Sequence, residues 1–279
     1  MVKSNLDQKL SLAVILIFTY SCASKNQEII KDETGNITLK CELKNGVRDG
    51  KCYEYYPNGA TKSISNWDEG IRDGEAIKYF ENGKIKETSM WKENKADGEF
   101  VEYLNNGYIY EMGQFTEGKQ SGLWVKFIEG MPIRTIQYVV AKDHDNYANQ
   151  WWIYDYFGDV KKEESHYYSI YSEKGDSIKV GEPGEIKIKL DAPLFGGYMK
   201  LVTGEFDRKF NPKDSTKLDT LNCVGFEGTI RFKFDERGFQ KIQGIILDGK
   251  EEKRHDDEKG EYTRTYQREI YFMRTFEVY

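Results

Sequence analysis

The stretch "EGIRDGEAIKYFENGKIKETSMW", residues 69–91, decides the fold, because it reads as turn, strand, Asn-Gly turn and strand. The same pattern returns every 24 residues along the first half of the chain. Three columns keep this step over four copies, namely Gly35, Gly59, Gly83 and Gly107; Gly46, Gly70, Asn94 and Gly118; and Gly50, Gly74, Gly98 and Gly122. A fixed period of this length is typical of a repeat array.

The columns predict two kinds of turn. Asn-Gly at 58–59, 82–83 and 106–107 favours a two-residue type I′ hairpin turn, because both central residues of that turn need positive φ. At the opposite edge, segments such as 69–74, "EGIRDG", carry Gly or Asn at both ends and predict longer return turns. Each repeat is therefore expected to contribute one hairpin.

The strands between these turns alternate apolar and charged residues. Ile77-Lys78-Tyr79 and Val101-Glu102-Tyr103 occupy equal positions in successive repeats, so we expect one apolar face and one charged face. A second column, Leu43, Trp67, Trp91 and Phe115, precedes each return turn. Stacked hairpins of this kind predict an elongated antiparallel meander over residues 35–138, in which each repeat contacts its neighbours.

The repeat unit "NGKIKETSMWKENKADGEFVEYLNNG", residues 82–107, resembles the variant MORN repeat of bacterial proteins labelled as YwqK-type antitoxins. The resemblance implies a repeat sheet that works by binding other proteins or membranes, and the antitoxin label implies neutralisation of a partner. It carries over no catalytic residue, because the matching positions are glycines, asparagines and aromatic residues that build the sheet.

The N-terminus has the pattern of an export signal. Lys3 and Lys9 precede an apolar run at 10–20, which is too short to cross a membrane as a helix. Ser21-Cys22 follows and resembles the lipobox of bacterial lipoproteins, in which the cysteine is acylated. We therefore expect a signal peptide at 1–21, a lipid anchor at Cys22 and a polar tether at 22–34. Without Asp after Cys22, the resemblance favours the outer membrane. The alternative is an ordinary cleaved signal.

An envelope location allows disulfides. Cys41 and Cys52 flank a turn and can lie on neighbouring strands, so a disulfide between them is one interpretation, and two small buried thiols are the other.

The second half departs from the period. We expect a linker at 139–150 and a separate domain at 151–279, where "GEIKIKL" (184–190) and "GTIRFKF" (228–234) alternate as strands do. Seven or eight strands between Gly, Pro and Asp clusters predict an immunoglobulin-like β-sandwich. The charged segment 250–261 is interpreted as a solvated hairpin loop, with a docking strip as the alternative.

The chain offers no recognisable catalytic constellation. Its three histidines lie in different segments, and it has no Gly-x-Ser-x-Gly or phosphate-loop motif. His144 lies between Asp143 and Asp145, but no glycine and distal glutamate complete a calcium loop. We therefore predict no enzyme activity, no cofactor and no metal site. The net charge of −6 also gives no reason to expect nucleic acid as a partner.

Exposed apolar residues are the remaining candidates for a functional surface. One set has the parity of the charged positions in the repeats, and the Trp pair near the domain boundary can either join the domains or extend this surface. The predicted partner-binding residues are Tyr56, Phe80, Leu104, Ile128, Trp151 and Trp152. The resulting hypothesis is a cell-envelope lipoprotein that acts as a protein-binding scaffold; the alternatives are an antitoxin or immunity protein and a glycan-binding envelope protein.

Overall fold

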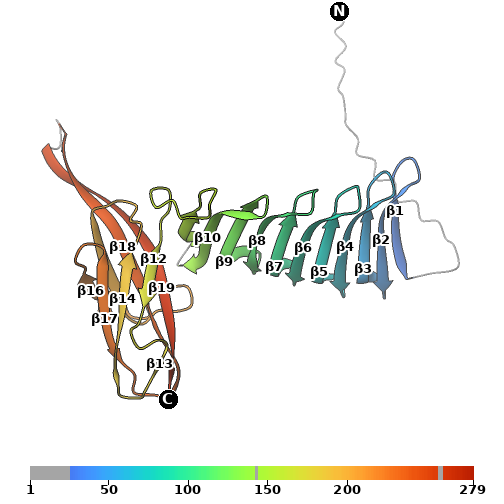
Figure 1. Ribbon diagram of the computed structural model, residues 1–279. Coiled ribbons are helices and arrows are strands. Elements are labelled where there is room, and N and C mark those ends of the chain that lie inside the picture. The colour runs from blue at the N-terminus through green and yellow to red at the C-terminus, as the bar shows by residue number, and fades with distance from the viewer. Residues whose placement is uncertain (1–25, 142–143, 257–259) are drawn as a thin grey trace, which may run out of the picture.

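The protein is all-β, with a long repeat sheet followed by a sandwich (Figure 1). The computed structural model describes residues 26–141, 144–256 and 260–279. The predicted fold class, an antiparallel meander of hairpin repeats followed by a β-sandwich, is confirmed. The predicted signal segment 1–21 and the predicted lipid anchor Cys22 lie outside the described residues. No helix in the described ranges 26–141, 144–256 and 260–279 is long and apolar enough to cross a membrane.

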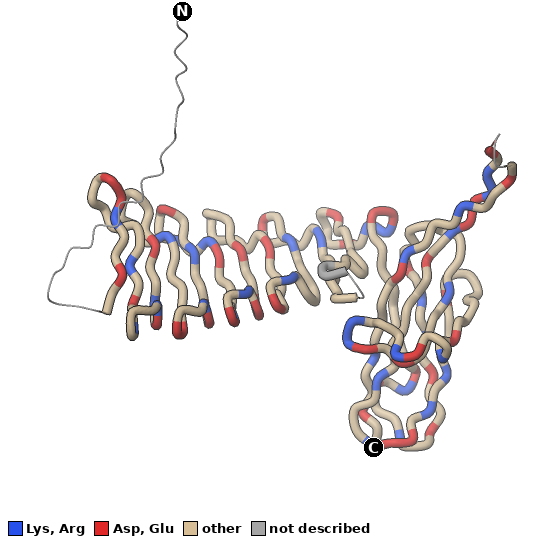
Figure 2. Tube along the Cα trace, turned by 180° about the vertical axis from the view of Figure 1, so that it is seen from behind, with Lys and Arg blue, Asp and Glu red and all other residues tan. Residues whose placement is uncertain are grey.

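The repeat sheet has eleven antiparallel strands in chain order. Each strand pairs with its neighbours in the chain, so that β1 and β11 lie at the two ends of the order, and Figures 1 and 2 show a single layer. Its strands are β1 Gln27–Lys31, β2 Ile37–Lys44, β3 Val47–Tyr55, β4 Thr61–Asp68, β5 Ile71–Tyr79, β6 Ile85–Lys92, β7 Lys95–Tyr103, β8 Ile109–Thr116, β9 Lys119–Ile128, β10 Met131–Ala141 and β11 His144–Ile153.

The two turn types lie at the edges opposite to those predicted. Positive φ at two successive residues occurs in the return turns, as at Glu69 (46°) and Gly70 (85°). In the Asn-Gly turns only the glycine has positive φ, as at Gly59 (81°). The reason is local, because the Asn58 side-chain oxygen accepts a hydrogen bond from the Ala60 backbone N–H at 2.9 Å and Gly59 N–H donates to the Tyr56 carbonyl.

The segment 27–31 is a strand, so the prediction of a polar tether at 22–34 is wrong there. β1 pairs with β2 and is the first strand of the repeat sheet among the described residues. Glu28 in this strand makes an ion pair with Arg48 of β3 at 2.8 Å. Gly35 belongs to the column of hairpin-turn glycines, and a hairpin turn has a strand on both sides. A strand before Gly35 could therefore have been predicted, but the polar composition of 23–34 favoured a tether.

The predicted linker at 139–150 is also wrong. Residues 139–141 complete β10, and 144–150 belong to β11, so the repeat sheet continues to Ile153. The 24-residue pattern stops earlier because one end of this last hairpin packs against the sandwich instead of facing solvent. Ala141 lies in a cluster with Ile245 and Tyr271 of the sandwich.

The second domain consists of a three-stranded and a five-stranded sheet, in the orders β12-β14-β17 and β13-β19-β18-β15-β16. Its core contains Ile186 and Ile188 of one sheet and Ile246, Ile270 and Phe272 of the other, all almost completely buried. The elements are β12 Tyr168–Tyr171, β13 Ser177–Ile178, β14 Pro183–Leu190, β15 Tyr198–Thr203, the short helix η1 Ser215–Lys217, β16 Asp219–Asn222, β17 Glu227–Lys233, β18 Gly238–Asp256 and β19 Gly260–Val278.

The charged segment 250–261 is mostly strand rather than loop. The ends of β18 and β19 pair as far as Asp256 and Gly260, and this two-stranded ribbon projects from the sandwich (Figure 1). Glu252 makes ion pairs with Lys250 at 2.7 Å and with Arg254 at 2.9 Å, which lower the pKa of Glu252 to about 2. The ribbon therefore satisfies much of its own charge locally.

A buried amide joins the repeat sheet to the sandwich. Asn149 of β11 is fully buried; its Nδ2 donates to the Tyr271 carbonyl at 2.8 Å, and its Oδ1 accepts from the Tyr271 N–H at 2.6 Å. The Tyr147 hydroxyl donates to the Glu269 carbonyl at 2.6 Å. Asn149 thus makes two hydrogen bonds to the backbone of β19, and these contacts hold the end of the repeat sheet against the sandwich.

Candidate functional site

The two faces of the repeat sheet differ in chemistry. On one face, strand pairing aligns Ile64, Ile77, Thr88, Val101 and Met112, and we call this the apolar face. The opposite face carries Arg48, Trp67, Arg72 and Trp91, and we call it the ladder face. The predicted separation into an apolar and a charged face holds only in part, because Lys78 and Glu102 have the parity of the ladder face but the tryptophans lie on that face as well.

Arginine and tryptophan alternate across the ladder face. Trp67 pairs with Arg72 in register, and the guanidinium carbon of Arg72 lies 3.8 Å from the ring centroid of Trp91. One repeat earlier, Arg48 lies 5.1 Å from the ring centroid of Trp67. Such stacks are worth about 0.5–2 kcal/mol each, and more where the cation is desolvated. They also fix the arginine side chains along the sheet.

Small buried residues beneath the ladder hold the tryptophan rings. Ser65 and Ser89 lie in the row that begins with Cys41 and Cys52. The Trp67 Nε1–H donates to the Ser65 hydroxyl at 2.9 Å, and Trp91 repeats the contact with Ser89 at 3.0 Å. Each indole N–H is thereby satisfied, and the ring orientation is set by the strand on which it lies.

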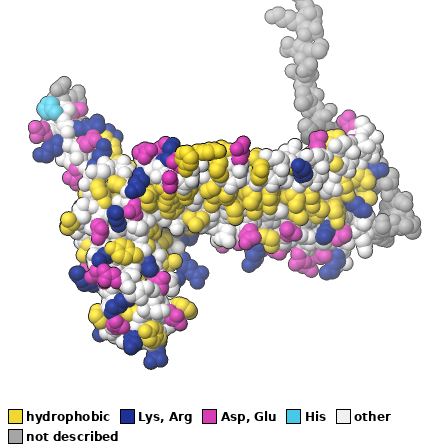
Figure 3. Space-filling view, in the orientation of Figure 1, with side chains coloured by type: hydrophobic (Ala, Val, Ile, Leu, Met, Phe, Trp, Pro, Cys, Tyr) yellow, Lys and Arg dark blue, Asp and Glu magenta, His cyan; other side chains and the backbone are white. Residues whose placement is uncertain are grey.

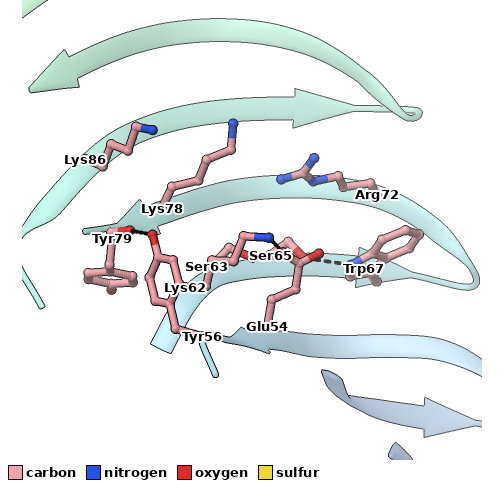
Figure 4. Close-up of a pocket in the computed structure, with 10 residues that line it drawn as sticks. All are labelled: Glu54, Tyr56, Lys62, Ser63, Ser65, Trp67, Arg72, Lys78, Tyr79 and Lys86. Atoms are coloured by element: carbon pink, nitrogen blue, oxygen red, sulfur yellow. Dashed lines mark hydrogen bonds and ion pairs between the residues drawn. The ribbon is translucent and has the colours of Figure 1, made fainter. Parts of the chain in front are cut away.

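A shallow groove of about 280 Å³ opens on the ladder face between β3 and β6 (Figure 4). Four of the residues that line it are cationic and only one is acidic. In Figure 4 the charged ends of Arg72, Lys78 and Lys86 lie along one side, with Trp67 and Tyr56 on the other. The lining residues are Glu54, Tyr56, Lys62, Ser63, Ser65, Trp67, Arg72, Lys78, Tyr79 and Lys86.

Two of the groove lysines have carboxylate partners. Lys62 lies 3.7 Å from Glu54, and Lys78 lies 2.8 Å from Glu87. Arg72 differs, because its Nε is buried without a hydrogen-bond acceptor and no carboxylate of the described ranges lies within ion-pair distance of it. Burial lowers the pKa of Arg72, and the nearby charges of Glu87 and Glu54 oppose that effect.

The predicted surface residues lie along the edge of the repeat sheet that bears the Asn-Gly turns. Tyr56 is half-buried in the groove wall, where its hydroxyl donates to the Tyr79 carbonyl at 2.7 Å. Phe80 is half-buried beside Lys86. Leu104 and Ile128 are exposed, at 36% and 53%, in later repeats. The structure thus brings only Tyr56 of this set into the groove.

Trp151 and Trp152 lie in β11, away from the groove. Trp151 is half-buried, 4.5 Å from the Arg268 guanidinium carbon and 5.1 Å from the ring of His166, and its Nε1–H donates to the Glu164 carbonyl. Trp152 lies against Tyr167. The structure therefore places this pair at the domain junction, the other role considered for it, rather than on an open partner-binding surface.

A buried polar cluster lies at the same junction. His166 and Asp248 are fully buried, with His166 Nδ1 2.8 Å from the Ala192 carbonyl oxygen and 3.8 Å from Asp248 Oδ2. Burial lowers the pKa of His166 to about 4, with Arg268 acting in the same direction, and burial raises the pKa of Asp248. His166 is therefore neutral near pH 7 and donates through Nδ1 to the carbonyl.

The predictions for the cysteine pair and for metal binding can be compared with the described residues. Cys41 and Cys52 form a disulfide between β2 and β3, beneath the first repeats. In the described part of the chain, no three His, Cys, Asp or Glu residues are grouped so that they could hold a metal ion. The side chains of the segment 143–145 lie outside the described residues.

Sequence reasoning found the tryptophan column but missed the arginines and lysines beside it. The available signal was the column Arg48, Arg72, Ala96 and Gln120, which keeps the 24-residue step and loses its charge after two repeats. Lys62, Lys78 and Lys86 carry no such signal, because single exposed lysines are common on any strand.

Neither the models of known protein families nor the curated proteins match this chain. The resemblance to the variant MORN repeat consequently stays an expectation based on the repeat unit.

Proposed function

We propose that the chain is a lipoprotein of the bacterial cell envelope, anchored through Cys22 in the outer membrane, whose repeat sheet binds a protein partner. The observation that carries this proposal is the single-layer repeat sheet: among the described residues, no second sheet or helix covers either of its faces over most of its length. A sheet in a compact domain normally buries at least one face against another layer. A sheet without that layer has surface available for another molecule.

The composition of the open surface supports a protein as the partner. In Figure 3, hydrophobic side chains form a band along the repeat sheet. Exposed apolar residues such as Ile71, Met90, Met112 and Leu123 recur in successive hairpins. Apolar surface of this extent is typical of interaction sites. Basic and acidic residues are intermixed along the strands in Figure 2, a distribution that favours a protein partner over a uniformly charged polymer or membrane.

Capture from envelope extracts with the full chain tests partner binding. We expect one protein to be retained reproducibly, and we expect its retention to be lost with Met112→Glu on the apolar face or Arg72→Gln on the ladder face. Phe239→Glu, at a 77% exposed position of the sandwich, is the matched control and should leave retention unchanged. Loss of retention only with Phe239→Glu would assign binding to the sandwich and contradict the proposal.

The envelope anchor has its own test. Mass spectrometry of the mature N-terminus should find an acylated Cys22 as the first residue. A mature chain that begins after residue 22, or that retains residues 1–21, would contradict the lipoprotein assignment.

A further inference from the structure

Successive repeats contain the same Arg–Trp stack in two different states. In the first repeat Arg48 stacks on Trp67, and its Nε donates to Glu28 Oε2 at 2.8 Å. In the second repeat Arg72 stacks on Trp91 in the same way but has no carboxylate partner in the described ranges. Glu28 therefore shows that an arginine stacked in this way can bind a carboxylate.

The missing partner follows from the repeat register. Glu28 lies in the row of Cys41 and Cys52, two strands before the arginine that it binds. For Arg72, the corresponding position two strands earlier is Cys52, which is buried in a disulfide and has no charge. The repeat thus supplies the stacked guanidinium a second time without supplying the acid.

The walls of the groove are suited to an acid brought by another molecule. Lys86 adds a second cation, which makes no ion pair with any described residue, while the aromatic rings of Trp67 and Tyr56 offer apolar contact on the other side (Figure 4). A volume of about 280 Å³ accommodates one or two side chains. Arginine recognises carboxylates through paired N–H donors, and partial burial strengthens such hydrogen bonds.

Charge on the rest of the ladder face argues against a lipid surface as the ligand. Glu87, Glu102 and Glu111 are aligned in register across β6, β7 and β8, beside the groove. The whole chain has a net charge of −6. An extended anionic membrane would meet these carboxylates, whereas a single acidic side chain inserted at Arg72 need not.

We propose that the groove around Arg72 binds an Asp or Glu side chain of the partner protein, flanked by an apolar residue that packs on Trp67 and Tyr56. This inference rests on the proposed function and specifies how the repeat sheet recognises its partner. Glu28 occupies the first copy of the site internally, so the second copy is the open one.

An array of capped pentapeptides tests this site with the full chain. Each peptide carries a central Glu between varied neighbours and is compared with its Gln counterpart. We expect a subset of the Glu peptides to bind at least tenfold more tightly than their Gln counterparts, with the preference decreasing as salt is raised. The preference should disappear in Arg72→Gln.

Two further variants separate this site from a general loss of structure. Arg48→Gln removes the equivalent stack, in which the arginine is already paired with Glu28 of the same chain. This variant should therefore keep the preference for Glu peptides. Glu28→Gln removes the internal acid of the first stack and should leave the Glu preference at Arg72 unchanged. Loss of the preference in Arg48→Gln as well, or an unchanged preference in Arg72→Gln, would overturn the inference.

Other outcomes also decide the matter. Equal binding of Glu and Gln peptides contradicts the carboxylate site, as does Arg72-dependent binding of phosphatidylglycerol vesicles without any peptide binding. Self-association of the full chain that is abolished by both Arg72→Gln and Glu102→Gln would assign the acid to a second copy and overturn the partner assignment. If Arg72→Gln still retains the envelope partner while Met112→Glu loses it, the scaffold proposal stands and the carboxylate inference fails alone.

Discussion

Arg48 and Arg72 occupy the same position in successive repeats and differ in one contact, the 2.8 Å ion pair from Arg48 to Glu28. Both stack on a tryptophan of the next strand of the repeat sheet. In a repeat sheet, where each unit contacts its neighbours, one substituted position can therefore turn a structural contact into an open site without changing the fold. That difference is the basis of the site proposed on the ladder face.

The contact between Gly113 and Trp124 predicts a packing defect on substitution. A Cβ built on Gly113 would lie 2.4–2.7 Å from the indole ring of Trp124, which is 4% exposed and packs against Phe100 and Phe115. Gly113→Ala should lower the free energy of unfolding by about 1–3 kcal/mol, as overpacking does. Chemical denaturation measures the change. In a Trp124→Leu background the same substitution should cost much less; an equal cost would exclude this contact as the cause.

The return turns predict a stabilising substitution. Glu69 has φ of 46°, a left-handed conformation that asparagine adopts more easily than glutamate. Glu69→Asn should raise the free energy of unfolding by about 0.5–1 kcal/mol, because Asn-Gly suits a type I′ turn. The reverse change, Asn45→Glu at the equivalent position (φ 53°), should lower it by a similar amount. Thermal and denaturant unfolding of both variants checks the pair, and effects of the same sign would contradict this explanation.

The disulfide between Cys41 and Cys52 predicts local stabilisation of the first hairpins. Its closed loop is short, with a sequence separation of 11, so chain entropy predicts a loss of about 2–3 kcal/mol in the double variant Cys41→Ser/Cys52→Ser. Hydrogen exchange should become faster in β1 to β3 and remain unchanged in β18 and β19, because repeat units unfold locally. Uniformly faster exchange along the whole chain would contradict this local effect.

His166 predicts a pH dependence of stability. Its pKa of about 4 in the folded chain lies below the ordinary value of 6.5. Between these two pH values His166 is therefore protonated in the unfolded chain and neutral in the folded chain. The stability contributed by neutral His166 is complete above pH 6.5 and decreases as the pH falls towards 4, by roughly 3 kcal/mol in total. The charge of Arg268 also lowers the pKa of His166, whereas Asp248 has a raised pKa that gives a slope of opposite sign.

A matched variant isolates the histidine from these neighbours. His166→Asn keeps a donor for the Ala192 carbonyl and removes the titrating group. The slope of unfolding free energy against pH between 4 and 6.5 should be smaller in His166→Asn than in the wild type by up to one proton equivalent. Identical slopes in the two proteins would show that His166 does not titrate as its burial predicts.

Local patterns in the sequence predicted most of the fold. The alternation in Ile186-Lys187-Ile188 predicted a strand with one buried face, and both isoleucines are fully buried in the sandwich core. The column of Gly59 and its equivalents predicted the hairpins, because a turn with positive φ recurs there. Their turn type was mispredicted because the hydrogen bond that the Asn58 side-chain oxygen accepts from the Ala60 N–H competes with the type I′ conformation.

The contacts that local patterns could not predict are those between distant residues. Asn149 makes hydrogen bonds to the backbone of Tyr271, 122 residues away, and no sequence pattern in either segment predicts that contact. β1 was mistaken for a tether because its strand pattern is short and polar. Arg72 has no carboxylate partner because position 52, which corresponds to Glu28, is a cysteine. That correspondence can be recognised only when the strand register is known.

Site-specific photocrosslinking in cells tests the central claim, that the ladder face of the repeat sheet binds a protein partner at the groove. The crosslinker replaces Lys86 in the groove or, as a control, Phe239 on the sandwich. We predict that the position of Lys86 crosslinks to one protein, next to an acidic residue of that protein, and that the product disappears in Arg72→Gln. Crosslinks from the position of Phe239 alone, with none from Lys86, would contradict the account.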